Sequence, residues 1–214
     1  MFSDLDAHAV PPIFQQNPDG GRTSISNFHY RGQDARIYGW AKITHPQQVS
    51  VGDHVIIDDF VFIGPHERLV VGNYVHLSSH LSIVGGGDCY LSDFSGYSTG
   101  VRILTGTDDF SGTGLTNSCI PPEFRQVQRG HVWVGPHVAI GANVVILPGV
   151  RIGEGAAVVA GSVVNRDLAP WGLYGGWPAR RIKARPPDVI LAAEADLFAR
   201  YGRPEREFRE PPQW

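Results

Sequence analysis

An apolar residue recurs at a fixed interval along most of this chain, and that interval restricts the possible folds more than any other feature. Three series of branched or aromatic side chains each step by 20 residues: Ile37, Ile57, Leu77 and Tyr97; Ile43, Ile63, Ile83 and Ile103; Val51, Val71 and Leu91. Repetition at such a period is typical of solenoid folds. The repeat therefore has to be explained before any single strand is assigned.

The three series interleave at separations of six, eight and six residues, so each period holds three six-residue units with two extra residues at one corner. Further along, the apolar positions fall strictly six apart: Val134, Ile140, Ile146, Ile152, Val158 and Val164. Three short strands per turn explain this pattern, because one side chain per strand points into a triangular core and stacked coils stabilise each other. The sequence predicts an all-β parallel β-helix, and a β-sandwich with coincidental spacing is the alternative.

The repeat is interrupted once, between Ile103 and Val134, by about 25 extra residues. This excursion loop, at about 105–131, leaves at the corner that carries the two-residue expansions. Loops of this length are usually functional, and aromatic residues such as Phe110 and Phe124 would be costly to leave in water. We expect the loop to pack on a neighbouring subunit.

Three regions follow from the pattern. Residues 1–34 form an N-terminal segment with no clear element, and residues 35–185 form the β-helix domain. Residues 186–214 form a C-terminal helix and tail, because Ile190, Ala193, Leu197 and Tyr201 fall at helical spacing. We expect this helix to run from about Pro187 to Tyr201.

Composition excludes several classes of function. The net charge of -3 comes from interspersed charges, so no basic field for nucleic acid exists. The two cysteines, Cys89 and Cys119, cannot form a disulfide framework. No apolar run approaches the length that spans a bilayer, and the residues up to Asn27 lack a secretion signal. We expect a cytoplasmic protein without membrane insertion.

The later coils resemble a known family. The run from Val134 to Arg185 contains hexads, a Gly-Ser-Val-Val stretch at 161–164 and a Gly-x-Pro-Ala-Arg-x-Ile-Lys ending at 176–183. In that order these features resemble the hexapeptide-repeat acyltransferases, which include galactoside, maltose and colanic-acid acetyltransferases and N-acetyltransferases of nucleotide-linked amino sugars. The resemblance covers roughly residues 37–185. It implies a left-handed β-helix, a homotrimer, and an active site between adjacent subunits that binds acetyl-CoA.

One departure from the family pattern concerns the catalytic base. The family loop usually carries a histidine in a stretch like Thr-Gly-Ser-His-Asp, and that histidine takes the proton of a sugar hydroxyl. Here residues 105–109 read Thr-Gly-Thr-Asp-Asp, so Asp108 stands in its place. The wider stretch 107–125 resembles acyltransferases acting on dTDP-linked 4-amino-4,6-dideoxy sugars. This favours N-acetylation of a nucleotide-linked amino sugar.

The candidate catalytic residues are Asp108, His80 and His76. Asp108 could accept the amine proton or hold the amine through a charge-assisted hydrogen bond. Asp88 falls on the same corner one coil below, so the two carboxylates could share a pocket and raise one pKa; both aspartates could instead be turn formers. Asp109 and Asn117 join Asp88 as candidate substrate-binding residues. We expect most of the other histidines considered to be surface residues; these are His45, His54, His66, His131 and His137, of which His54, His66 and His137 lie at turns or corners of the coils and His45 and His131 in loops.

The resemblance also implies where the co-substrate acetyl-CoA binds. Its pantetheine arm would lie beside small residues of the late coils, Gly141, Ala142, Ala160 and Gly161. Its phosphates and adenine would meet Arg166, Pro178, Ala179, Arg180 and Arg181. No metal is expected, and neither cysteine shows a motif that would activate it as an acyl carrier.

Two other functions remain open at this point. The first is O-acetylation of a sugar or glycan hydroxyl, with His76 or His80 as base. The second is a non-enzymatic β-helix, or a relative of the γ-class carbonic anhydrases, although the matching histidine spacing is missing. Synthesis of surface polysaccharide, including lipopolysaccharide, is the usual setting of the resembling enzymes.

Overall fold

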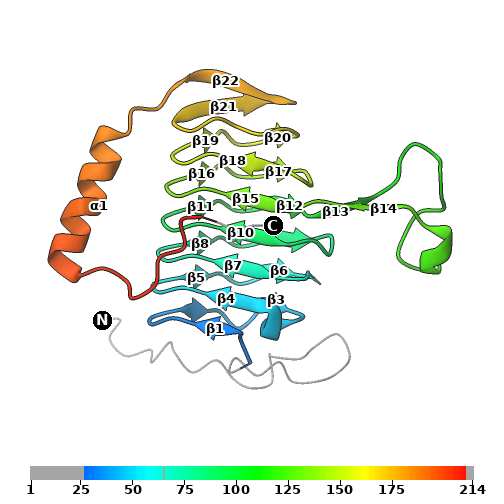
Figure 1. Cartoon of the computed structure of the whole chain (residues 1–214), viewed down its shortest axis with the longest axis horizontal. Coiled ribbons are helices and arrows are strands. Elements are labelled where there is room, and N and C mark those ends of the chain that lie inside the picture. The colour runs from blue at the N-terminus through cyan, green and yellow to red at the C-terminus, as the bar shows by residue number, and fades with distance from the viewer. Residues whose placement is uncertain (1–26, 65, 211–214) are drawn as a thin grey trace, which may run out of the picture.

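The repeat folds into a left-handed parallel β-helix (Figure 1), as a computed structural model of the chain shows. The structure describes residues 27–64 and 66–210. Most of the N-terminal segment assigned from the sequence lies outside these described residues. The predicted β-helix is confirmed, and the β-sandwich alternative is wrong.

Three parallel sheets form the walls of the helix. The first holds β1 (Tyr30–Arg31), β4 (Val49–Val51), β7 (Leu69–Val71), β10 (Cys89–Leu91), β15 (Val132–Val134) and β18 (Arg151–Ile152). The second holds β2 (Arg36–Ile37), β5 (Ile56–Ile57), β8 (His76–Leu77), β11 (Gly96–Tyr97), β16 (Ala139–Ile140), β19 (Ala157–Val158), β21 (Gly172–Gly176) and the antiparallel β22 (Ala179–Ala184). The third holds β3 (Lys42–Ile43), β6 (Phe62–Ile63), β9 (Ser82–Val84), β12 (Arg102–Leu104), β17 (Val145–Ile146) and β20 (Val163–Val164).

The apolar series predicted from the period line the core. Ile57 pairs with Leu77 and Leu77 with Tyr97, so residues 20 apart stack directly. A second buried column lies at the turns, two residues before the strand positions, and the sequence analysis missed it. Its members include Val55, Val61, Val75, Leu81, Val101, Val138 and Val144. Each hexapeptide therefore buries two side chains rather than one.

One corner of the helix carries a ladder of stacked rings. His54, Tyr74, Phe94 and His137 all have φ between 55° and 59°, a left-handed conformation that non-glycine residues rarely adopt. Their ring centroids follow one another at 4.7, 4.9 and 5.1 Å, and stacking of this kind stabilises a pair by about 1 kcal/mol. The stacking thus offsets part of the backbone strain.

Two of the histidines expected at the surface are buried. His137 is 7% exposed because its ring is covered by the ladder and by the C-terminal helix, and Nε2 lies 3.2 Å from Glu194 Oε2. His66 is 5% exposed, with Nδ1 2.6 Å from the Gly64 carbonyl oxygen. Burial lowers the pKa of both imidazoles. For these two residues the expectation was wrong: Glu194 of the C-terminal helix lies against His137, and the His66 ring turns in toward the Gly64 carbonyl.

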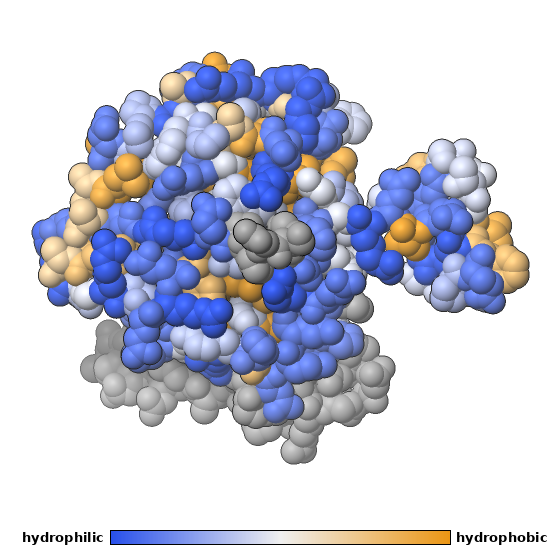
Figure 2. Space-filling view, viewed as in Figure 1, coloured by the Kyte–Doolittle hydropathy of each residue, from blue (hydrophilic) through white to orange (hydrophobic). Residues whose placement is uncertain are grey.

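The excursion forms an arm, defined here as residues 105–131. Its two strands, β13 (Gly106–Asp108) and β14 (Val127–Arg129), pair antiparallel, and a short 3-10 turn, Pro122–Phe124, lies near its far end. The arm projects away from the β-helix (Figure 1), and apolar groups show on its surface (Figure 2). Phe110 is 92% exposed and Phe124 58%. Leu91 pairs directly with Val134, so the coils stack as if the arm were absent.

The chain ends in the predicted helix. α1 runs from Asp188 to Tyr201 and lies beside the β-helix (Figure 1), with Phe198 edge-on to Phe94 at 5.7 Å. The tail then returns to the first sheet, where the Phe208 N–H donates to Asp93 Oδ2 at 2.9 Å. In the described part of the chain, α1 lacks the length and apolarity needed to cross a membrane.

Candidate functional site

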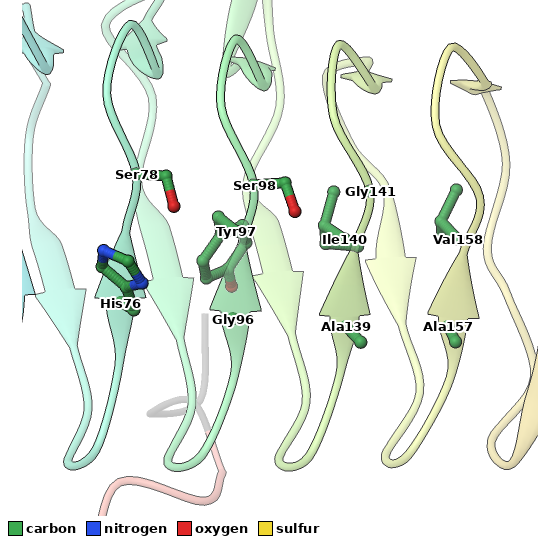
Figure 3. Close-up of a pocket in the computed structure, with 10 residues that line it drawn as sticks. All are labelled: His76, Ser78, Gly96, Tyr97, Ser98, Ala139, Ile140, Gly141, Ala157 and Val158. Carbon is green, nitrogen blue, oxygen red and sulfur yellow. The ribbon is translucent and has the colours of Figure 1, made fainter.

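A groove of about 400 Å³ crosses the outer face of the second sheet (Figure 3). Side chains alternate along a strand, so the residues on either side of each inward residue face outward. One outward column holds His76, Gly96, Ala139 and Ala157, and the next holds Ser78, Ser98 and Gly141. Except for His76 these residues are small, so the groove floor lies close to the backbone.

Gly96 is the most open position of that floor. A Cβ added there would meet nothing within 4 Å, so the sheet does not require glycine at this position. Gly141 differs, because a Cβ there would lie 2.5 Å from the backbone nitrogen of Ala160. The coil stacking excludes a side chain at Gly141, whereas at Gly96 free space lies above the backbone.

A second cavity, of about 380 Å³, lies where the arm leaves the coils. We call it the arm cavity; it is lined by Val84, Gly85, Gly86, Gly106, Thr107, Asp108, Ser118, Arg125, Val127 and Arg129. Asp108 Oδ1 accepts a hydrogen bond from Arg125 Nη2 at 2.8 Å, and Oδ2 accepts one from the Asn117 N–H at 3.1 Å. These two contacts fix the carboxylate at the cavity wall.

The same contacts lower the pKa of Asp108, the hydrogen bond from Arg125 contributing most. The carboxylate is therefore ionised at neutral pH and holds protons weakly. An ionised carboxylate can bind an amine, because it accepts charge-assisted hydrogen bonds from the N–H groups. It is a weaker base than the histidine that the family resemblance places there.

The two substrate-binding candidates on the arm shape its backbone. Asp109 accepts hydrogen bonds from the N–H and hydroxyl of Ser111, at 2.9 and 2.6 Å, and from those of Thr113, at 2.7 and 2.8 Å. These bonds hold the pKa of Asp109 far below its usual range. Asn117 Oδ1 accepts a hydrogen bond from the Cys119 N–H at 2.9 Å, which closes a turn. The backbone N–H of Asn117 donates to Asp108 Oδ2.

Asp88 lies apart from the arm cavity. Its Oδ2 is 3.2 Å from Arg68 Nη2 and 3.9 Å from His131 Nδ1, and the side chain is 9% exposed. The 20-residue register ends at Leu104, which pairs with Val84, and Asp108 lies beyond it on the arm. Asp88 does not line the arm cavity, so the structure does not bring the two carboxylates into one pocket there, and the pKa of Asp108 is lowered rather than raised.

The two candidate histidines occupy different places. His76 lines the groove, with Nε2 3.0 Å from Asp58 Oδ2. His80 lies at a corner with φ of 64°, and its ring stacks on Phe60 at 5.2 Å. Neither histidine lines the arm cavity.

The residues assigned to acetyl-CoA spread over the late coils. Gly141 lines the groove, and the Gly161 N–H donates to the Ala142 carbonyl at the adjacent corner at 2.8 Å. Ala160, Arg166, Pro178, Arg180 and Arg181 are exposed, whereas Ala179 is buried. Within residues 27–64 and 66–210, no three His, Cys, Asp or Glu side chains form a group that could hold a metal ion.

The sequence analysis missed Ser78 and Ser98 in the groove and Arg125 and Arg129 in the arm cavity. The serines could have been found, because each directly follows an inward residue, Leu77 or Tyr97, and so faces outward. No repeat runs through the arm, so its arginines had no comparable signal.

Comparison with known proteins agrees with this arrangement. Residues 131–166 match the family model for bacterial transferase hexapeptide, six repeats. The chain is 34% identical over 160 residues to the dTDP-4-amino-4,6-dideoxy-D-glucose acyltransferase of Escherichia coli, covering 74% of this chain and 83% of that one. It is 28% identical over 156 residues to the galactoside O-acetyltransferase of Escherichia coli K12, covering 65% and 71%.

A solved structure extends the comparison to bound ligands. AntD, an N-acyltransferase from Bacillus cereus, was solved in complex with dTDP and 3-hydroxybutyryl-CoA. It superimposes with a TM-score of 0.75 and 35% identity over 81% of this chain and 92% of that chain. A variant of AntD in which a serine is replaced by cysteine was solved with dTDP-4-amino-4,6-dideoxyglucose and coenzyme A.

Proposed function

We propose, from the premise that this chain belongs to the hexapeptide-repeat acyltransferase family, that it transfers an acetyl group from acetyl-CoA to the amino group of a nucleotide-linked amino sugar. The observation that carries this proposal is Asp108, ionised and held by Arg125 at 2.8 Å where an O-transferring relative would carry a histidine. An amine is nucleophilic once neutral, so it needs orientation more than it needs a strong base. The dTDP-amino-sugar named for the Escherichia coli relative supports this choice of acceptor.

The chemistry follows from that geometry. The neutral amine attacks the thioester carbonyl carbon, a C–N bond forms, and the C–S bond to coenzyme A breaks. As bonding proceeds the nitrogen becomes positively charged, and its proton becomes acidic enough for Asp108 to accept. The departing thiolate is finally protonated, so one amide and one thiol leave the site. Asp108 orients the amine before attack and stabilises the positive charge during it.

The donor would lie along the groove. Gly96 lets a pantetheine arm approach the sheet, Gly141 lines the same groove, and Ala142, Ala160 and Gly161 would continue the path along the late coils. The exposed Arg166, Arg180 and Arg181, beside Pro178 and Ala179, would meet the phosphates and adenine. Because AntD was solved with 3-hydroxybutyryl-CoA, donors longer than acetyl-CoA belong in the test.

A homotrimer would complete the site. The groove and the arm cavity share no lining residue, and the arm projects away from the coils (Figure 1). A neighbouring copy would bring its arm, with Asp108 and the exposed Phe110, against the groove wall. We place this trimer in the cytoplasm, where acetyl-CoA is available, in the synthesis of surface polysaccharide such as lipopolysaccharide.

O-acetylation of a sugar hydroxyl is the second candidate. His76 lines the groove and its Nε2 lies 3.0 Å from Asp58 Oδ2, an arrangement in which a carboxylate can orient a general base. The similarity to galactoside O-acetyltransferase also favours O-acetylation. This mechanism would require His76 and leave Asp108 with a supporting role.

The deciding experiment measures coenzyme A release with a thiol reagent. Acetyl-CoA and 3-hydroxybutyryl-CoA are offered with dTDP-, UDP- and GDP-linked amino sugars and with their hydroxyl counterparts. Turnover confined to an amino sugar, lost in Asp108→Ala and kept in His76→Ala, supports N-transfer. Turnover confined to hydroxyl acceptors, lost in His76→Ala, would replace it with O-transfer. Light scattering on the same protein tests the trimer.

A further inference from the structure

The arm cavity holds a positive charge that acyl transfer at Asp108 does not use. Arg125 is paired with Asp108, and its Nε is buried without a hydrogen-bond partner in the described structure. Arg129 lines the same cavity, and none of the ion pairs among residues 27–64 and 66–210 involves it. The cavity wall therefore carries one carboxylate and two guanidinium groups.

The strand geometry fixes how these charges are arranged. Asp108 pairs with Val127 and Gly106 pairs with Arg129. Residues two apart share a face of a strand, so Val127 and Arg129 of β14 both face the cavity. Arg125, just before β14, lines the same cavity. Along β14, Arg129 is about 7 Å from Val127, the residue that pairs with Asp108. Arg125 lies on the other side of Val127 and is ion-paired with Asp108.

Glycines provide the space that Arg129 occupies. A Cβ on Gly86 would lie 2.9 Å from Arg129 Nε, so the guanidinium stem rests directly on that glycine backbone. Gly106, opposite Arg129, also has no side chain. Ser118 and Thr107 add hydroxyl groups to the lining. The result is a polar cavity with the Asp108 carboxylate at one end and, at the other, the Arg129 guanidinium, which has no carboxylate partner among the described residues.

We propose that Arg129 binds the diphosphate of the acceptor while Asp108 holds its amine. A nucleotide-linked 4-amino sugar carries its amine on C4 and its phosphate on C1, at opposite ends of one pyranose ring. That separation matches a carboxylate and a guanidinium placed two strand positions apart. Guanidinium groups bind phosphate oxygens through paired, charge-assisted hydrogen bonds. This inference rests on the proposed function and names the residue that selects a nucleotide-linked sugar over a free one.

Calorimetric binding of dTDP and of coenzyme A provides the test, because both ligands contain a diphosphate. We expect Arg129→Gln to weaken dTDP binding by about 10- to 100-fold, with coenzyme A binding unchanged within about twofold. The dTDP affinity of Arg129→Lys should fall between those of wild type and Arg129→Gln, because lysine keeps the charge but cannot form the paired hydrogen bonds. Arg200→Gln is the matched control: Arg200 is 68% exposed on α1 and pairs with Asp196.

Steady-state kinetics adds an independent readout. Loss of a contact made equally to substrate and transition state raises KM and leaves kcat unchanged, so Arg129→Gln should raise the acceptor KM at nearly constant kcat. Unchanged dTDP binding and unchanged KM would overturn the assignment, as would a loss confined to coenzyme A. A wild-type protein that binds dTDP through Arg129 yet acylates no amino sugar would overturn the proposed function and leave this inference standing.

Discussion

Arg125 Nη2 lies 2.8 Å from Asp108 Oδ1, so the carboxylate at the place of the family histidine receives its counter-ion from the segment between the 3-10 turn and β14 of the same arm. The pair joins β13 to the start of the arm's return path, and the Asn117 N–H donates a further hydrogen bond to the carboxylate. Because both carboxylate oxygens are engaged, Asp108 has a fixed direction as well as a fixed charge.

Asp108→Asn keeps the size of the side chain and removes its charge. If Asp108 orients the amine and receives its proton, kcat should fall by about 100-fold or more, the range typical of lost acid–base assistance. Coenzyme A release measured by a thiol reagent gives the rate, and calorimetry should show coenzyme A binding unchanged. A kcat within about threefold of wild type would remove Asp108 from the mechanism.

The pH dependence of the reaction follows from the lowered pKa of Asp108. A carboxyl group with a lowered pKa stays ionised as pH falls, so Asp108 does not titrate between pH 9 and 6. Loss of kcat/KM over that interval should therefore come from protonation of the acceptor amine. Arg125→Ala should lower the rate without moving the midpoint of this acid limb. A midpoint that shifts in Arg125→Ala would mean that Asp108 itself is being titrated.

Gly96→Val tests the groove as the donor site. A Cβ at this position meets nothing within 4 Å, and β-branched residues suit strands, so the melting temperature should not fall. The side chain would fill the groove and raise the KM for acetyl-CoA by about tenfold or more, which corresponds to roughly 1.4 kcal/mol of binding. An unchanged KM would move the donor elsewhere.

Gly141→Ala serves as the contrasting variant. Its Cβ would lie 2.5 Å from the Ala160 nitrogen, so we expect it to destabilise the fold by about 1–3 kcal/mol, as overpacking does. Urea unfolding of both variants separates the two effects. A stable Gly141→Ala protein would show that the coils can move apart at this point.

Stability should fall as pH drops below about 6.5, the ordinary pKa of histidine. Burial, with the charges of Arg209 and Arg185, lowers the pKa of His137 more than Glu154 and Asp93 raise it. Below pH 6.5 the unfolded chain binds a proton that folded His137 does not, so the free energy of unfolding decreases until the pH reaches the lowered pKa. His66 acts in the same direction.

His137→Phe should flatten this dependence while keeping the stack on Phe94. Urea unfolding of wild type and variant at pH 7, 6 and 5 measures the difference. Equal losses in the two proteins would assign the acid sensitivity to groups other than His137.

The fold could be predicted from the repeat because the inward strand position recurs at a constant spacing, as at Ile57, Leu77 and Tyr97, even though the second buried position of each hexapeptide was missed. The candidate site was harder to predict. Asp108 could be named from the family pattern, but its partner Arg125 lies 17 residues away in a segment without a repeat. The place of His80 in a ring stack with Phe60 depends on the neighbouring coil, which a linear pattern does not reveal.

The direct pairing of Leu91 with Val134 has a consequence for how such enzymes diversify. The hydrogen-bonded ladder closes across the arm, so the arm's length and contents can change without altering the register of any coil. One insertion or deletion can therefore replace the whole arm while the wall that carries the groove stays intact, and under the proposed function this would change the choice of acceptor without changing the donor site. A chimaera that carries a relative's arm between these two coils should fold on this scaffold and acquire that relative's choice of acceptor.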